Sequence, residues 1–292
     1  MKKLLSLLLC ILLLAGCAPA TYDGPTTTVP RLTEYTVDHY YNFFGREHQH
    51  DTKRTVYAYD IYGNLVKSME YQNDELTYVT KLRYDDRGNE IARTVWDHTG
   101  WFPKLSDRTR RTYDGQNRLL TSESLTLWGT VESGSYYSYD DEAGTETYRN
   151  ESGEVLQVAW YDENGHIIRQ TSEEYETVYE YDDRGNLTVW TSYKNGALYD
   201  RYEAVYDDRD RQILGTRYDA AGAVVNQTEY IYDDDQGTKF FTKSDGSRRV
   251  ETYRTDGRID AIVDFDAEDN VSMIQRYYYR DILVPAEGGT EP

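Results

Sequence analysis

Three of the five histidines lie close together near the start of the chain, where they could bind a transition metal. They are His39, His48 and His50, and the carboxylates Glu47 and Asp51 lie beside them. Residues two apart on a strand point to the same face, so His48 and His50 could bind zinc or copper together with a carboxylate. The alternative is a polar edge strand whose imidazoles are solvated.

Five tryptophans could supply a binding surface: Trp96, Trp101, Trp128, Trp160 and Trp190. A flat aromatic ring stacks on the apolar face of a sugar, while polar groups at the rim of the site bind the hydroxyls. Trp101 lies in a Gly-Trp-Phe-Pro stretch, so it is the one of the five that we expect to be exposed. The alternative is that the rings fill the inner surface of a sheet.

The motifs of common enzyme classes are absent from the sequence. It contains no Gly-x-Ser-x-Gly, Gly-x-x-x-x-Gly-Lys or His-Glu-x-x-His. With 52 acidic residues, a pair of carboxylates has no specificity for glycosidase chemistry. We therefore expect no enzymatic activity and no cofactor. The net charge of −20 also argues against nucleic acid as a partner.

The first residues have the features of a secretory signal. Two lysines precede residues 4–14, which are apolar apart from Ser6, and small residues follow. This run is too short to span a bilayer, which takes about 20 residues. The ending Leu-Ala-Gly-Cys resembles the lipobox of bacterial lipoproteins, which implies cleavage after residue 16 and a diacylglycerol on Cys17. The alternative is an ordinary secreted protein.

The rest of the chain divides by composition. Residues 17–34 contain three prolines and a threonine run, which we interpret as the lipidated cysteine and a flexible tether. A repetitive domain is expected over residues 35–282, and a disordered tail over residues 283–292. The only cysteines are Cys10 and Cys17, so a disulfide framework and a cysteine-based zinc site are excluded.

A six-residue pattern recurs through the repetitive domain: an aromatic residue, Asp, two variable residues, then Gly, Asn or Asp. An Asp at this position accepts a backbone N–H two residues on, and Gly, Asn and Asp tolerate a positive φ best. The pattern is typical of a hairpin built on a type I turn and a left-handed residue. Ten copies occur, and in two of them the Gly arrives one position late, at Gly144 and Gly237; the copies begin at Tyr59, Tyr84, Tyr113, Tyr139, Tyr161, Tyr181, Tyr206, Tyr218, Tyr232 and Phe265.

The residues that flank these turns alternate with period two, which indicates strands. The sequence predicts an all-β fold of about 18–22 antiparallel strands, because copies mostly lie two strand-and-turn spacings apart. One edge would carry the Asp turns and the other the irregular turns. Sheets of more than about ten strands curl, so we expect a twisted meander that curls into an open or partly closed shell, with tyrosines on its concave face.

This pattern resembles the YD repeats of bacterial Rhs proteins, wall-associated proteins and teneurins. The resemblance covers most of residues 55–282 and implies long β-sheets wound into hollow shells. The chain departs from the family in being too short for a full shell and in lacking Asp-Pro anywhere. The toxin-delivery role of the large members is therefore not carried over.

These observations predict a lipoprotein on the extracytoplasmic face of a bacterial cell membrane, held by a diacylglycerol anchor. We expect a non-enzymatic binding module for a glycan or a surface protein, acting through the tyrosine and tryptophan face. Two alternatives are a passive envelope spacer and a metal-binding protein that uses the histidine cluster.

Overall fold

The computed structural model describes residues 26–43 and 46–285, without the side chains of residues 41–43 and 46–50. Cys17, the signal segment and residues 286–292 lie outside these described residues, as do the side chains of His48 and His50. Predictions about them therefore stay predictions.

The described residues form strands and short turns, with no helix, which confirms the all-β prediction. The strand number, 20, falls in the expected range. In chain order the strands are β1 (Thr26–Phe43), β2 (Arg46–Tyr59), β3 (Leu65–Gln72), β4 (Glu75–Tyr84), β5 (Glu90–Asp97), β6 (Lys104–Tyr113), β7 (Leu119–Leu125), β8 (Val131–Asp140), β9 (Thr145–Asn150), β10 (Val155–Tyr161), β11 (Ile167–Ser172), β12 (Tyr175–Tyr181), β13 (Leu187–Lys194), β14 (Ala197–Tyr206), β15 (Gln212–Asp219), β16 (Val224–Asp233), β17 (Thr238–Lys243), β18 (Arg248–Tyr253), β19 (Ile259–Phe265) and β20 (Val271–Pro285).

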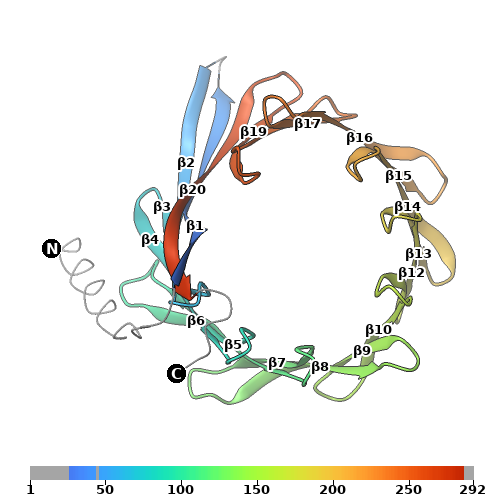
Figure 1. The fold of residues 1–292 in the computed structure, drawn as a ribbon, viewed down its shortest axis with the longest axis horizontal. Coiled ribbons are helices and arrows are strands. Elements are labelled where there is room, and N and C mark those ends of the chain that lie inside the picture. The colour runs from blue at the N-terminus through green and yellow to red at the C-terminus, as the bar shows by residue number, and fades with distance from the viewer. Residues whose placement is uncertain (1–25, 44–45, 286–292) are drawn as a thin grey trace.

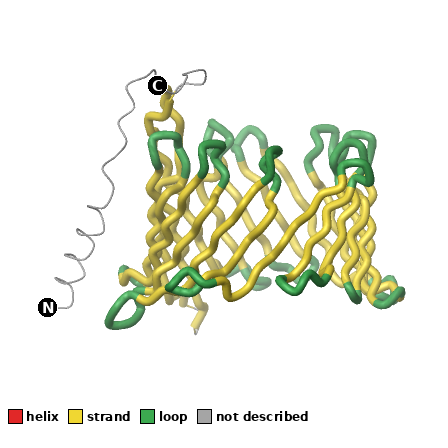
Figure 2. The backbone as a smooth tube through the Cα atoms, turned by 90° about the horizontal axis from the view of Figure 1, so that it is seen from below, coloured by secondary structure: helices red, strands yellow, loops and turns green. Residues whose placement is uncertain are grey.

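The meander closes into a ring. Each strand pairs antiparallel with the next, and β1 also pairs with β20, from Thr26 opposite Pro285 to His39 opposite Met273. Figure 1 shows the ring viewed along its axis, and Figure 2 shows that the strands slant relative to that axis. With about 4.8 Å between strands and a tilt of about 40°, twenty strands give a ring about 40 Å across. Closure leaves neither β1 nor β20 as an unpaired edge.

The ring has two rims. The turns that follow even-numbered strands curl toward the ring axis and define the narrow rim, while those that follow odd-numbered strands point outward and define the wide rim (Figure 1). Eight of the ten Asp turns lie on the narrow rim. The turns that begin at Asp219 and Asp266 lie on the wide rim, so the prediction that one edge holds all of them was wrong for these two. Turn chemistry is local and works on either edge, and the 12 residues from Tyr206 to Tyr218 leave room for only one strand.

The predicted limits of the tether and of the tail also need correction. Strand β1 begins at Thr26 and β20 ends at Pro285, so residues 26–34 and 283–285 belong to the sheet. The β-branched run of residues 26–29 suits a strand. Its partner is the other end of the chain, which no local sequence pattern could reveal. Both ends of the described chain lie at the narrow rim, because β1 and β20 pair there with Thr26 opposite Pro285.

The Asp turns have the predicted geometry. In eight copies Asp Oδ1 accepts the backbone N–H groups two and four residues on, as Asp182 does from Arg184 at 3.0 Å and Asn186 at 2.8 Å. All ten expected left-handed positions have a positive φ, including Gly185 at +86° and the late Gly144 at +62°. Each turn therefore reverses the chain at a residue that tolerates this conformation.

The repeated tyrosine has a structural role that its hydroxyl explains. The ladder between β13 and β14 stops at Val189 opposite Glu203, which leaves the carbonyl of Leu187, the first residue of β13, without a ladder partner. The Tyr206 hydroxyl donates to this carbonyl at 2.9 Å. Six other tyrosines donate in the same way at 2.7–2.9 Å: Tyr59, Tyr84, Tyr113, Tyr139, Tyr181 and Tyr232. A buried carbonyl needs a partner, and the hydroxyl continues the sheet where the backbone ladder ends.

Among the tyrosines that precede narrow-rim turns, Tyr161 and Tyr253 are the exceptions, and the turn before the neighbouring strand explains them. The strand that pairs with each of them, β9 for Tyr161 and β17 for Tyr253, begins after a turn with the late Gly. The ladder therefore reaches the first residue of that strand, as with Thr145 opposite Trp160. That carbonyl is then already paired. The Tyr161 hydroxyl donates instead to Glu146 Oε2 at 3.0 Å, and the Tyr253 hydroxyl to Glu251 Oε2 at 2.6 Å. On the wide rim, the Tyr218 hydroxyl donates to Glu203 Oε2 at 3.0 Å.

The sheet is a single layer with a thin core. Among the described residues no side chain is less than 2% exposed, and the buried hydrophobic residues are scattered around the ring: Val37, Val79, Leu82, Leu125, Ala159, Ala204, Ile262 and Val284. Cross-strand pairs, turn caps and tyrosine contacts therefore contribute a larger share of stability here than in a layered protein.

Candidate interaction surfaces

Two neighbouring loops on the wide rim expose large aromatic side chains. Trp101 is 85% exposed and Phe102 79%, in the β5–β6 loop of residues 98–103. Trp128 is 89% exposed, in the β7–β8 turn of residues 126–130. We call these two segments the aromatic loops. Successive turns on one rim lie two strands apart, or about 10 Å, so the two loops can contact one partner.

The second aromatic loop is a turn of the same type as the Asp turns. Thr126 replaces the Asp, and its Oγ1 accepts the Thr130 N–H at 3.1 Å, while Gly129 has a φ of +85°. The two variable positions of such a turn, Leu127 and Trp128, project into solvent. The predicted exposure of Trp101 is confirmed, and Trp128, for which no exposure was predicted, is as exposed. The Thr-x-x-Gly spacing is the signal that would have predicted it.

The other three tryptophans lie within strands, away from the aromatic loops. Trp96 on β5 lies opposite Val79 and Leu105. Trp160 on β10 lies beneath Arg169, whose guanidinium carbon is 4.8 Å from the ring centroid. Trp190 on β13 stacks on Tyr202 with 5.9 Å between centroids. All three are half-buried, so the ring does not bring the five predicted tryptophans to one place.

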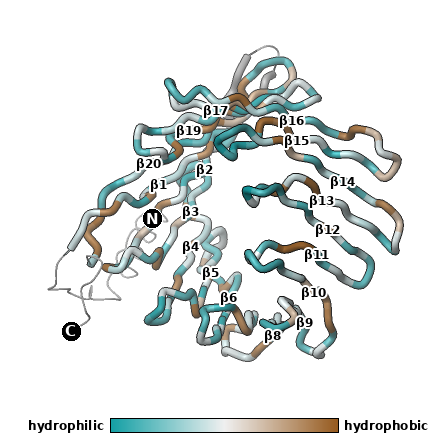
Figure 3. The backbone as a smooth tube through the Cα atoms, turned by 45° about the vertical axis from the view of Figure 1, so that its right-hand side comes forward, coloured by the Kyte–Doolittle hydropathy of each residue, from teal (hydrophilic) through white to brown (hydrophobic). Residues whose placement is uncertain are grey.

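The aromatic loops differ in charge from the turns of the narrow rim. The nine narrow-rim turns contain 18 Asp and Glu residues against 7 Arg, within residues 60–64, 85–89, 114–118, 140–144, 162–166, 182–186, 207–211, 233–237 and 254–258. The two aromatic loops contain no Asp, Glu, Lys or Arg. Figure 3 shows hydrophobic positions at outward hairpin tips, including the one between β15 and β16. The narrow rim is therefore strongly acidic, while the aromatic loops are neutral.

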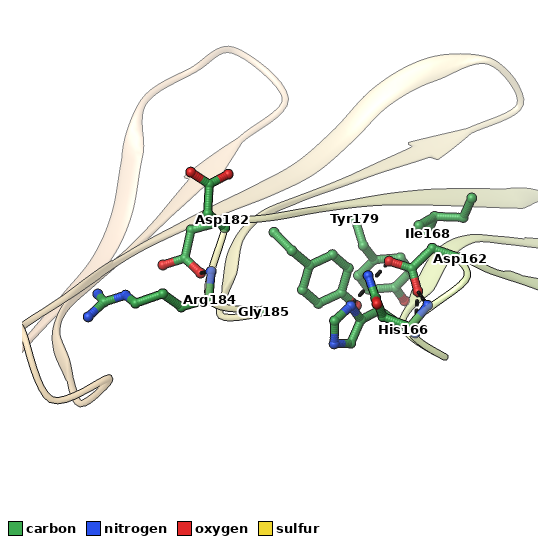
Figure 4. Close-up of a pocket in the computed structure, with 10 residues that line it drawn as sticks. Asp162, His166, Ile168, Tyr179, Asp182, Arg184 and Gly185 are labelled. Atoms are coloured by element: carbon green, nitrogen blue, oxygen red, sulfur yellow. Dashed lines mark hydrogen bonds and ion pairs between the residues drawn. The ribbon is translucent and has the colours of Figure 1, made fainter.

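An open groove of about 560 Å³ lies on the narrow rim between the turns at 162–166 and 182–186 (Figure 4). His166 stacks on Tyr181 with 4.7 Å between ring centroids, and its Nδ1 is 3.2 Å from Asp162 Oδ2. Arg184 points away from His166 and forms an ion pair with Asp210 at 3.0 Å. The groove opens because position four of the second turn is Gly185, which has no side chain to reach back across it.

Electrostatics in the groove follow from its hydrogen bonds. The His166 backbone N–H and then its imidazole hold the pKa of Asp162 below its usual range, while burial raises the pKa of Tyr181. The Tyr179 hydroxyl donates to Gln170 Oε1 at 2.6 Å. Among the lining residues no serine, cysteine or threonine lies beside the imidazole as a nucleophile. The groove is large enough to hold a small polar group.

The predicted metal site is only partly described. The β1–β2 ladder places His39 opposite Asp51 and Tyr41 opposite His48. Within the described residues no group of three or more His, Cys, Asp or Glu could hold a metal ion. The side chains of His48 and His50 fall outside them, so metal binding stays a prediction. A search of the described part of the chain also found no helix long and apolar enough to cross a membrane.

A comparison with protein families finds the model described as RHS Repeat at residues 161–198. Residues 161–198 therefore match the RHS repeat, which the YD pattern of the sequence indicated. The matched stretch runs from the end of β10 to the start of β14, and it includes both turns that line the groove. These copies keep the Tyr-Asp-x-x-Gly form, as do those that begin at Tyr59, Tyr84 and Tyr218, in contrast to copies with Asn117 or Asp210 at the fourth position after the tyrosine. A comparison with curated proteins found no match.

The solved structures that match this chain share little sequence with it. The crystal structure of TcdB2-TccC3 is 12% identical, with 82% of this chain and 17% of that chain covered and a TM-score of 0.31. A porin-like protein from Bacteroides uniformis is 12% identical, with 88% and 99% covered and a TM-score of 0.36. A putative outer membrane lipoprotein-sorting protein domain from Vibrio parahaemolyticus is 10% identical, with 92% and 87% covered and a TM-score of 0.19. This chain thus spans about a sixth of the TcdB2-TccC3 chain, and at these TM-scores the likenesses say nothing of function.

Proposed function

We propose that this protein is a lipid-anchored, non-enzymatic binding module on the extracytoplasmic face of a bacterial cell membrane, and that its aromatic loops bind a glycan. The observation that carries the proposal is the pair of neutral loops that expose Trp101 and Trp128 on one rim of an otherwise acidic ring.

The position of the chain ends supports this arrangement. The described chain begins with Thr26 at the narrow rim, nine positions after Cys17. Nine residues span at most about 30 Å. A ring tethered through Cys17 would therefore hold its narrow rim nearer the membrane and direct the aromatic loops away from it. Two acyl chains on one cysteine give stable anchoring, which a single chain does not.

The chemistry of the loops favours a neutral partner with flat apolar faces. Trp101, Phe102 and Trp128 provide aromatic planes, and Thr99 and Thr130 provide hydroxyls beside them. Stacking of sugar rings on such planes needs no charge. A protein partner would use the same rings as hot spots, and a passive spacer would use none of them, so both alternatives can be separated by experiment.

The test uses the fragment of residues 18–292 on a glycan array, with Trp101→Ala and Trp128→Ala as variants. Tyr62→Ala is the matched control, since Tyr62 is an exposed aromatic on the narrow rim. We expect at least a tenfold loss of binding in the tryptophan variants, unchanged melting temperatures, and normal binding by the control. Binding that survives both tryptophan variants would overturn the assignment of the site. An array without binding would favour a protein partner or a passive spacer.

The anchor has its own test. Cells that express the full chain are labelled with radioactive palmitate, and Cys17→Ser is compared with Cys10→Ser. Label should depend on Cys17 alone, because Cys10 lies inside the expected signal segment. Label retained in Cys17→Ser would refute the lipoprotein prediction.

A further inference from the structure

Strand β1 closes the ring and bonds to two neighbours along its length. It pairs with β20 over 13 residue pairs, from Thr26–Pro285 to His39–Met273. On its other side it pairs with β2 over 10 residue pairs, from Glu34–Val56 to Phe43–Arg46. We call the contacts of β1 with β20 and β2 the seam.

Side chains connect the three strands of the seam. Asp38 on β1 accepts from Arg276 Nη1 of β20 at 2.6 Å and from Thr52 Oγ1 of β2 at 2.9 Å. The Asp38 side chain is only 14% exposed, so water competes little for it. The Tyr35 ring packs against that of Tyr277 of β20, with 4.9 Å between centroids and 45° between the ring planes.

A second group of contacts fixes the N-terminal half of β1 at the narrow rim. The Tyr59 hydroxyl of β2 donates to the Leu32 carbonyl at 2.7 Å, and Arg31 Nε donates to the Gly63 carbonyl at 3.3 Å. The Tyr35 hydroxyl donates to Gln275 Oε1 at 2.9 Å. These contacts lie on both sides of β1, so a displacement along its axis would break bonds on both sides at once.

From this arrangement we propose that the ring is built to carry tensile load between its N-terminal attachment and its wide rim. The hydrogen bonds of an antiparallel ladder lie perpendicular to the strands. A pull on the N-terminus away from the wide rim runs along β1, so it loads the bonds of both ladders in parallel. The inference does not depend on which partner the aromatic loops bind.

The same geometry makes the ring weak in another direction. Thr26 and Pro285 are opposite each other at the narrow rim. Pulling these two ends apart acts along the hydrogen bonds of the β1–β20 ladder, so the pairs open one at a time. The resistance should therefore depend strongly on the points of attachment, although the protein and its total stability are the same.

Single-molecule force spectroscopy can test this, because the chain from residue 18 onward contains no cysteine. One handle is placed at Ala18→Cys. The second is placed either at Glu75→Cys, at the wide-rim end of β4 close to β1, or at Ala286→Cys, directly after β20. Because parallel loading engages both ladders, we expect the wide-rim pair to rupture at about twice the force of the terminal pair or more. Equal forces, or a stronger terminal pair, would overturn the proposal.

A variant of the seam gives a second readout. Asp38→Asn should lower the rupture force of the wide-rim pair, since it weakens the contact that joins β20, β1 and β2. Asp264→Asn is the matched control, because Asp264 pairs with Arg249 between β18 and β19, outside the seam. Circular dichroism confirms that both variants fold. A control that weakens the wide-rim pair as much as Asp38→Asn does would show that the seam has no special role.

Discussion

Replacing Tyr206 with phenylalanine removes one oxygen and tests the role assigned to the repeated tyrosine. In the ring, the Tyr206 hydroxyl donates to the Leu187 carbonyl at 2.9 Å, two residues beyond the last pair of the β13–β14 ladder. The ring of phenylalanine would keep the packing. The variant therefore isolates the hydrogen bond.

The expected loss can be worked from this single contact. A hydrogen bond of this kind contributes about 0.5–1.5 kcal/mol, and a carbonyl left without a partner in a dry site costs up to about 3 kcal/mol. Both residues are half-buried, so water can reach the carbonyl and we take about 1 kcal/mol. For a domain of this size, that corresponds to a melting temperature lower by about 2–4 °C.

The assay is thermal unfolding followed by circular dichroism, with Tyr62→Phe as control. The Tyr62 side chain is 53% exposed on the narrow rim and should not affect stability. Losses of stability at distant sites add. Replacing Tyr84, Tyr139 and Tyr206 together should therefore lower the free energy of unfolding by about three times the single loss. If Tyr206→Phe melts at the wild-type temperature, or if Tyr62→Phe loses as much, the hydroxyl does not hold the sheet.

The remaining predictions concern turns and protonation. Gly185→Val forces a β-branched residue to a φ of +86°, so unfolding in urea should show a loss of about 1–2 kcal/mol; a gain or no change would contradict the turn assignment. Asp210→Gly relieves a left-handed aspartate but removes the acceptor of Asn186 Nδ2, at 2.9 Å, so its urea midpoint should stay near wild type and not rise. Asp182 has a pKa below its ordinary value of 3.8, chiefly because the Asn186 side chain donates to it. Its stabilising effect is therefore present above pH 3.8 and is lost as the pH falls below that value. The melting temperature of Asp182→Asn should fall less between pH 5 and pH 3 than that of wild type. An equal fall would refute this. On the alkaline side, burial raises the pKa of four tyrosines from 10.0 to about 12: Tyr35, Tyr139, Tyr161 and Tyr230. Their protonated forms favour folding below pH 10, and this contribution to stability should be lost as the pH rises through 12. Absorbance at 295 nm and circular dichroism, recorded together during the titration, would detect the loss.

The sequence predicted those parts of the fold that depend on neighbouring residues. The Asp turns followed from the need for a cap and for a residue that tolerates a positive φ, and every expected left-handed position was found. Strand number followed from the spacing of the turns. Closure could not be predicted in this way, because the pairing of Thr26 with Pro285 joins residues 259 positions apart.

The candidate site was predictable to a similar extent. The exposure of Trp101 followed from its loop. The exposure of Trp128 was not predicted, because Thr126 takes the place of Asp in its turn. The half-buried positions of Trp96, Trp160 and Trp190 depend on cross-strand neighbours such as Tyr202, which a single sequence does not reveal. The sequence therefore indicated where rings could bind, and the ring geometry selected the two that project from one rim.

Departures from Gly at the fourth position of the turn have a structural reason. Asn117 and Asp210 adopt φ values of +64° and +60°, which Gly would adopt with less strain. Each accepts a hydrogen bond from the preceding turn, Asn117 from Asn89 at 3.0 Å and Asp210 from Asn186 at 2.9 Å. At Gly185 no such bridge can form, and the groove opens there. At Asn117 and Asp210, a side chain in place of Gly thus joins two neighbouring turns, whereas the turns at 162–166 and 182–186 stay apart and leave the groove open.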